Sequence, residues 1–167
     1  GIKKGDRMPD GMVSGFEFLL KAPENGKQEK ISEIISGKPS LFVFWSPYCP
    51  ACVPKLAEIA GKKDELPYNK INIVAVTNQS IPAPSDEVEK EQFLSQFPEE
   101  MRKNLETAEK ELSLKVEVPD EKGETVSGKI RVSAVPLYVA VDSEGIIKAV
   151  TIGDFDTVKK ELDKLVR

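Results

Sequence analysis

Histidine is missing from all 167 positions of the chain. Its absence excludes Ser-His-Asp and Cys-His catalysis, histidine general bases and histidine-ligated metals. Cysteine is scarce as well, because only Cys49 and Cys52 occur. Structural zinc takes four ligands, mostly cysteine and histidine, so two thiolates do not complete a site. We therefore expect no metal; a zinc ion shared by two copies of the chain is the one arrangement left open.

Long apolar runs and long basic runs are also missing. No stretch approaches the roughly 18 apolar residues of a membrane-spanning helix. A formal net charge of −4 without a basic tract predicts no nucleic-acid partner. No signal peptide is recognisable. Residues 1–5 resemble the start of a mature or shortened protein, so any signal peptide or membrane anchor is expected to lie outside this sequence. The length and a hydrophobic content of 40% suit a single domain over residues 1–167.

The two cysteines form a C-x-x-C motif, Cys49-Pro50-Ala51-Cys52, directly behind the apolar run 41–45. A strand that leads such a motif into a helix places a thiol at the positive end of the helix dipole. The dipole favours the thiolate, which is the nucleophile of disulfide exchange. A structural disulfide is one alternative, although closing so small a loop removes little entropy from the unfolded chain; a pair of idle thiols is another. The motif favours a redox-active disulfide that needs no separate cofactor.

The apolar pattern predicts alternating strands and helices. A strand is expected over 16–20 with a hairpin turn at 24–27, followed by a short helix around 31–35. Residues 40–45 are apolar on both faces, as a central strand is, and residues 71–76 predict another buried strand. Between them, the residues after the cysteines follow helical spacing. Such a βαβ unit predicts a parallel pair of strands.

A long helical stretch is expected over 86–112, after the turn-rich residues 77–86. Pro98 is expected to split it into two helices, because proline interrupts helical hydrogen bonding. Its apolar stripe could face a partner, but packing against the core is the favoured interpretation. The stripe consists of Phe97, Met101, Leu105, Ala108 and Leu112.

The C-terminal third predicts a strand over 114–118, a turn over 119–123 and a hairpin of two strands, 137–141 and 146–152. A closing amphipathic helix is expected to be capped by Asp154. Its apolar face carries Phe155, Val158, Leu162 and Leu165.

This element order, with the C-x-x-C at the first strand-to-helix junction, resembles the thioredoxin fold, an α/β fold with a central mixed sheet flanked by helices. Residues 44–52, Phe-Trp-Ser-Pro-Tyr-Cys-Pro-Ala-Cys, look like the family's F-W-A-x-W-C-x-x-C block. Residues 133–137 look like the segment with the family's cis-proline, here Pro136, and Gly153 matches the glycine before the last helix. The N-terminal strand pair and the helical insertion around 86–112 make the chain similar to TlpA/ResA-type thiol–disulfide oxidoreductases of the thioredoxin-like superfamily.

The resemblance implies a role for each cysteine. Cys49 would be the exposed nucleophile, and Cys52 would resolve the mixed disulfide with the substrate. Pro136 would be cis and face the dithiol, while the backbone of Val135 would meet an extended substrate strand. The residues expected to support the site are Trp45, Tyr48, Pro50 and Ala51, of which Trp45 is equally explicable as core.

Several positions depart from the family. Val43 replaces the buried carboxylate of thioredoxin, and Lys55 replaces a glutamate common in TlpA/ResA-type proteins. The proton acceptor for Cys52 is thus not identified; Lys55 is expected in solvent, with charge stabilisation of a thiolate as the alternative. Ala57 replaces the kink-forming helix proline, so a kink is expected to have moved to Pro54.

The dipeptide between the cysteines, Pro50-Ala51, is a further departure. Strong oxidants of the DsbA type have a histidine in this dipeptide, and the pKa of their first cysteine is about 3.5. Ala51 offers no charge to a thiolate. The dipeptide therefore predicts a reductant rather than a strong oxidant.

The resemblance implies a reductase of protein disulfides outside the cytoplasm, and we expect a monomer. In the TlpA/ResA-type branch such proteins serve cytochrome c maturation or related pathways and receive electrons from a membrane protein. Cytosolic thiols support the same chemistry, so a cytoplasmic location stays open. One alternative is a peroxiredoxin-like peroxide reductase with the motif P-x-x-x-[T/S]-x-x-C, to which Ser46 conforms but Phe42 does not. A non-catalytic binding module of the same fold is the other.

Overall fold

The computed structural model describes residues 1–16, 26–78 and 87–167. Its strands form one sheet in the order β2-β1-β5-β4-β3-β6-β7. They are β1 (Met12–Gly15), β2 (Gln28–Lys30), β3 (Ser40–Phe44), β4 (Asn72–Thr77), β5 (Ser113–Val118), β6 (Leu137–Val141) and β7 (Ile147–Ile152). The helices are α1 (Ile31–Ile35), α2 (Cys52–Gly61), α3 (Glu87–Leu94), α4 (Glu99–Glu111), α5 (Val126–Ile130) and α6 (Phe155–Leu165), with a 3₁₀ turn at Tyr68–Lys70. Within the described ranges, no helix has the length and apolar character needed to cross a membrane.

The centre of the sheet is parallel and its flanks are antiparallel. β3, β4 and β5 run parallel, whereas the pairs β1–β2, β1–β5, β3–β6 and β6–β7 are antiparallel. The predicted βαβ unit is thus β3-α2-β4, and its strands are in register from Ser40↔Asn72 to Phe44↔Val76. All five residues of β3 are buried because helices cover both faces of the sheet at this point.

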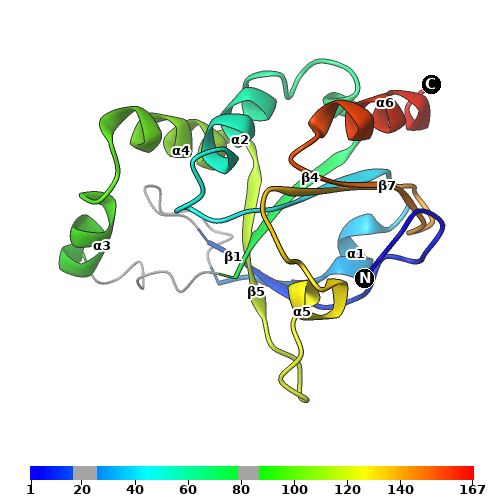
Figure 1. Cartoon of the computed structure of the whole chain (residues 1–167), viewed down its shortest axis with the longest axis horizontal. Coiled ribbons are helices and arrows are strands. Elements are labelled where there is room, and N and C mark those ends of the chain that lie inside the picture. Colours follow the sequence, from blue (N-terminus) through cyan, green and yellow to red (C-terminus); the bar gives the residue numbers. More distant parts are fainter. Residues whose placement is uncertain (17–25, 79–86) are drawn as a thin grey trace.

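Helices form a layer on each side of the sheet (Figure 1): α2, α4 and α6 lie on one face, and α1 and α5 lie on the other. Alternate residues of β3 enter different cores, since successive strand residues point to opposite faces. Leu41 and Val43 pack in the core beneath α2 and α6, and Phe42 and Phe44 pack in the core beneath α1 and α5. The predicted mixed sheet flanked by helices is confirmed.

The N-terminal strand pair is present, and its first strand, β1, covers residues for which no strand was predicted. β1 ends at Gly15, whose N–H donates to the carbonyl of Lys27, while the N–H of Gly26 donates back to the Gly15 carbonyl. Phe16 follows the strand, and residues 17–20 of the predicted strand lie outside the described residues. The same holds for residues 24 and 25 of the predicted turn and for residues 79–86 of the predicted turn-rich stretch.

The helical insertion is confirmed, with the break where proline predicts it. α3 ends before Pro98, which occupies the N-cap position of α4. Leu105 and Ala108 of the apolar stripe are buried in the core against α2. Phe97 and Met101, nearer the start of α4, are only partly buried. The stripe is core along most of α4 and reaches the surface at one end.

Helix α5 was not predicted, because its five residues include Gly128 and only two apolar positions, whereas the equally short α1 has three isoleucines. Thr125 caps it by accepting a hydrogen bond from the N–H of Gly128, and it ends at Arg131, whose φ of 62° is left-handed. Val126 and Ile130, one turn apart, are its buried residues.

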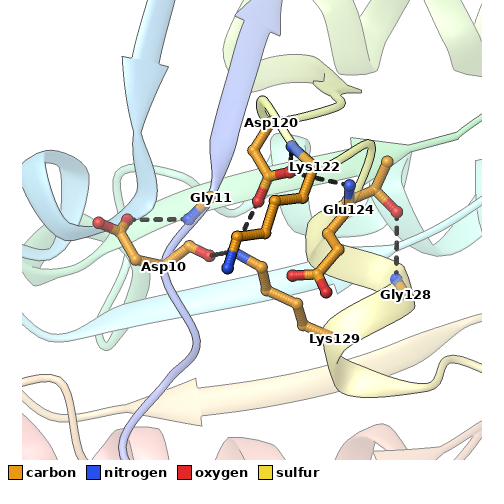
Figure 2. A network of polar contacts seen from close by, with 8 residues as sticks. Asp10, Gly11, Asp120, Lys122, Glu124, Gly128 and Lys129 are labelled. Atoms are coloured by element: carbon orange, nitrogen blue, oxygen red, sulfur yellow. Dashed lines mark hydrogen bonds and ion pairs between the residues drawn. The ribbon is translucent and has the colours of Figure 1, made fainter.

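A polar network holds α5 against the N-terminal segment (Figure 2). The Lys129 ammonium donates to the carbonyl oxygen of Asp10 at 2.9 Å and lies 3.6 Å from a carboxylate oxygen of Asp120. The Asp120 carboxylate also accepts from the backbone N–H groups of Lys122 and Glu124, which closes the predicted turn before α5. The network fixes the helix from which the chain continues to residues 132–136.

The predicted kink at Pro54 has no basis in the structure. Pro54 is the third residue of α2, and the first N–H groups of an α-helix have no partner within the helix. A proline there removes no helical hydrogen bond. The expectation that the kink had moved to Pro54 is therefore wrong.

Asp10 joins the N-terminal segment to the start of α1. Its carboxylate accepts hydrogen bonds from the N–H of Gly11, the N–H of Ser32 and the Ser32 hydroxyl, each at 2.9 Å. Burial alone would raise the pKa of Asp10, but the hydrogen bonds from Ser32 and Gly11 outweigh it and lower the pKa. The ionised carboxylate therefore stabilises the fold above its ordinary pKa of about 3.9, and this contribution is lost as the pH falls through the folded-state value.

We expect Asp10→Asn to lower the free energy of unfolding at pH 7 by less than about 1 kcal/mol, because solvent screens an exposed carboxylate. The difference from wild type should shrink in strong acid, where both side chains are neutral. Urea unfolding at pH 7 and in acid measures this, with Asp64→Asn, an exposed position beyond α2, as the control. A loss of stability that is independent of pH would contradict the role of the carboxylate charge.

Candidate active site

The two cysteines lie where β3 passes into α2. The N–H of Cys49 donates to the carbonyl of Ser46 at 3.0 Å, and the N–H of Cys52 donates to the carbonyl of Cys49 at 3.1 Å. These two turns place the sulfur atoms side by side, and they form a disulfide with a Cα–Cα distance of 5.3 Å. That distance is within the range of ordinary disulfides. The predicted dithiol is thus able to close.

The two sulfur positions differ in exposure. Cys52 is the first residue of α2 and is 0% exposed, whereas Cys49 is partly exposed. Pro50 and Ala51 between them are exposed and leave the approach to Cys49 open. A partner in disulfide exchange can therefore reach Cys49 and not Cys52.

The start of α2 is suited to a negative charge. Ala51 occupies the N-cap position and offers no side-chain oxygen, and no acidic residue lies in the first turn. The first backbone N–H groups of the helix are thus not capped by a side chain within the described structure. Together with the helix dipole they favour a thiolate on the neighbouring Cys49.

The loop before β6 reaches the dithiol from far along the chain. Val135 and Pro136 are joined by a cis peptide bond, as the resemblance implied, and the Cys49 sulfur lies 3.8 Å from the carbonyl oxygen of Val135. Pro136 is buried, and its carbonyl accepts from the N–H of Gly153 at 2.9 Å. A carbonyl oxygen accepts from a thiol but repels a thiolate, so this contact opposes part of the effect of the helix.

The two aromatic residues of the motif have different surroundings. Trp45 is 1% exposed and stacks on Phe16 with a centroid separation of 6.5 Å, so it belongs to the core behind the site. Tyr48 is 50% exposed and contacts the ring of Phe97, with centroids 5.8 Å apart. The sequence placed Phe97 in the apolar stripe of the predicted helices but not beside Tyr48, because that contact depends on how the start of α4 packs beside α2.

The groups around Cys52 leave its proton acceptor unassigned. Val43 is fully buried where thioredoxin has a carboxylate. The ammonium of Lys55 is 2.8 Å from Glu58 and 5.2 Å from the centroid of Phe155, so it is directed to them rather than to a thiolate. Tyr138, opposite Val43 in the β3–β6 register, is buried. Burial, with a smaller contribution from the charge of Glu58, raises the pKa of Tyr138 to about 12, so it stays neutral at physiological pH.

The residues described in the structure contain no group of three or more histidine, cysteine, aspartate or glutamate side chains placed to hold a metal ion. The chemistry that the site offers is that of the two sulfur atoms. The thioredoxin-like proteins that the chain resembles generally work with such a cysteine pair and no further cofactor.

Comparison with known proteins identifies the family. A family model described as Redoxin matches residues 3–166. The thioredoxin domain of a thiol-disulfide oxidoreductase from Bacteroides vulgatus is 17% identical, with a TM-score of 0.68 over 100% of both chains. An exposed lipoprotein thioredoxin from Streptococcus pneumoniae is 18% identical, with a TM-score of 0.59 over 94% of this chain and 100% of that one. AhpC of Mycobacterium tuberculosis is 21% identical, with a TM-score of 0.61 over 98% of this chain and 93% of that one. No curated protein matches the chain.

At these identities the solved structures establish the fold, and the family model supplies the relationship. The match leaves out only the first two residues and the last one. The resemblance to the thioredoxin-like superfamily is confirmed, and with it an oxidoreductase built on a cysteine pair. The chain belongs to the Redoxin family.

Proposed function

We propose that this protein is a thiol–disulfide oxidoreductase that reduces disulfides in protein substrates, with Cys49 as the nucleophile and Cys52 as the resolving thiol. The observation that carries the proposal is the unequal exposure of the two sulfur positions at the start of α2. Only an exposed thiolate can attack a substrate, whereas the resolving thiol acts within the protein and can be buried.

The reaction follows from this geometry. The Cys49 thiolate attacks one sulfur of a substrate disulfide, forming a mixed disulfide and releasing the other sulfur as a thiolate that takes a proton. Cys52 then loses its proton and attacks the Cys49 sulfur, which releases the second substrate thiol. Two electrons have passed to the substrate, and the Cys49–Cys52 disulfide seen in the structure is the oxidised product. A separate donor must reduce it for the next cycle.

The finer assignments are part of the same proposal. We propose a TlpA/ResA-type reductase in one domain, acting as a monomer outside the cytoplasm and reduced by a membrane protein. The similar fold of an exposed lipoprotein thioredoxin from Streptococcus pneumoniae supports the location. The N-terminal strand pair β1–β2 and the inserted helices α3 and α4 support the assignment to the TlpA/ResA type. These are the two features on which the resemblance to TlpA/ResA-type proteins was based.

Peroxide reduction is the competing activity, since AhpC shares the fold. The site disfavours it. Phe42, at the position of the motif's proline, is a buried core residue of β3, and the Ser46 hydroxyl accepts a hydrogen bond from the N–H of Tyr48 at 3.2 Å. We expect the protein to accelerate the reduction of insulin by dithiothreitol and to consume hydrogen peroxide slowly when reduced. Rapid peroxide consumption without insulin reduction would reverse the choice.

The redox potential gives a further prediction. The start of α2 favours a Cys49 thiolate, but Ala51 adds no charge to it and the Val135 carbonyl opposes it, so the reduced form is stabilised less than in DsbA. We expect equilibration with glutathione to give a potential nearer to about −270 mV, as in thioredoxin, than to about −120 mV, as in DsbA. The matched variant Ala51→His adds a charge beside the sulfur and should make the potential less negative. A wild-type value near that of DsbA would refute the assignment as a reductant.

A further inference from the structure

An apolar surface beside Cys49 joins the reactive sulfur to α4. Tyr48, the residue before Cys49, is half-exposed, and its ring contacts Phe97. Phe97 and Met101 are themselves only partly buried against the core. Soluble proteins expose few large apolar side chains in clusters, and such clusters mark binding sites. An aromatic pair at the reactive sulfur is therefore placed to meet the substrate.

The surface continues into a groove. Phe97 also lines a groove of 530 Å³ whose other residues are Ser95, Glu99, Arg102, Lys103 and Glu106. Figure 1 shows that this groove's helix, α4, lies beside α2, the helix that begins at Cys52. Phe97 is thus the link between the aromatic pair at the dithiol and a groove large enough for a short peptide segment.

The charges of the groove balance. It has two acidic and two basic side chains, and Lys103 lies 3.5 Å from Glu99. Glu106 in turn lies 3.1 Å from Lys110 on the outer face of α4. Selection of a substrate by net charge is not supported by such a surface. The apolar contact with Phe97 and Tyr48 is the feature that can discriminate.

We propose that Phe97 is a specificity-determining residue, which selects polypeptide disulfides that have an aromatic or large aliphatic residue close to the cysteine. This inference rests on the proposed function. Tyr48 directly precedes Cys49, so a substrate side chain a few residues from the attacked sulfur reaches the aromatic pair.

Two synthetic peptide dimers, each joined by one intermolecular disulfide, test the proposal. They are identical except for phenylalanine or glycine next to the cysteine. The protein is first reduced at both cysteines and then serves as the only reductant. The measured quantity is the rate at which it reduces the phenylalanine peptide divided by the rate for the glycine peptide. We expect the phenylalanine peptide to react about fivefold faster with wild type, the scale of one apolar aromatic contact. Phe97→Ala should bring the ratio close to that found with dithiothreitol.

Controls separate the possible failures. Leu66→Ala removes an exposed apolar side chain beyond the far end of α2 and should leave the wild-type ratio unchanged. Phe97→Leu keeps apolar packing on the core and should give an intermediate ratio even if the alanine variant does not fold. A wild-type ratio equal to that of dithiothreitol, or one retained by both Phe97 variants, would overturn the proposal. If neither peptide is reduced, the proposed function itself fails.

Discussion

Cys49→Ser should lower the catalysed part of insulin reduction, which is the rate above that of dithiothreitol alone, by about a thousandfold or more, because removal of a catalytic nucleophile acts on this scale. The hydroxyl of serine does not ionise at neutral pH and forms no mixed disulfide. The assay follows insulin precipitation with wild type and variant at equal concentration. Equal rates for the two proteins would indicate a binding module whose dithiol is idle.

Cys52→Ser is the matched control, because it also keeps a single thiol. This variant retains the partly exposed Cys49, so it should still attack the substrate and then stop at the mixed disulfide. We expect the covalent adduct of insulin with Cys52→Ser to accumulate on a non-reducing gel and to be absent with Cys49→Ser. Accumulation with Cys49→Ser instead would exchange the roles of the two cysteines.

Trp45→Ala should lower the free energy of unfolding by about 3–5 kcal/mol, the usual cost of removing a large aromatic side chain from a core. Trp45 is 1% exposed and stacks on Phe16, so little water or side chain can fill the space it leaves. Urea unfolding followed by circular dichroism measures the change, since the chain has no other tryptophan to report by fluorescence.

Trp45→Phe is the control for this core position. The indole N–H of Trp45 is buried and has no hydrogen-bond partner in the described part of the chain. Replacing tryptophan by phenylalanine therefore breaks no hydrogen bond. We expect a cost of about 1–2 kcal/mol, which reflects the smaller ring alone. If Trp45→Ala lowered the free energy of unfolding by less than about 1 kcal/mol, Trp45 would not be a core residue. The expected role of Trp45 in supporting the active site would then be the better explanation.

Long or strongly patterned elements could be predicted from the sequence. β3 and β6 are buried at every position and are apolar apart from Ser40 and the hydroxyl group of Tyr138, as central strands covered on both faces are. α6 could be predicted from its apolar stripe and from Asp154, whose carboxylate accepts from the hydroxyl of Thr157 at 2.7 Å. In each case the signal lies within the element itself.

What could not be predicted depends on tertiary contacts or on very short elements. The strand β1 was not predicted, since its four residues carry too little alternation. The contact between Tyr48 and Phe97 joins positions 49 residues apart, and it depends on how α4 packs beside α2. Pro136 was identified as cis through the family resemblance, whereas Pro67, also cis, had no such signal. The single-domain organisation and the roles of the individual site residues stay predictions.

The central claim is that Cys49 is the reactive sulfur and that Cys52 is shielded. Alkylation of the fully reduced protein with iodoacetamide over a range of pH, read at each cysteine by mass spectrometry, tests it most directly. We predict modification at Cys49 with an apparent pKa between the value of about 3.5 for DsbA and the free value of about 8.5. Cys52 should stay unmodified on the same time scale, because it is buried. Equal modification of both cysteines, or a Cys49 that ionises like a free thiol, would contradict the account.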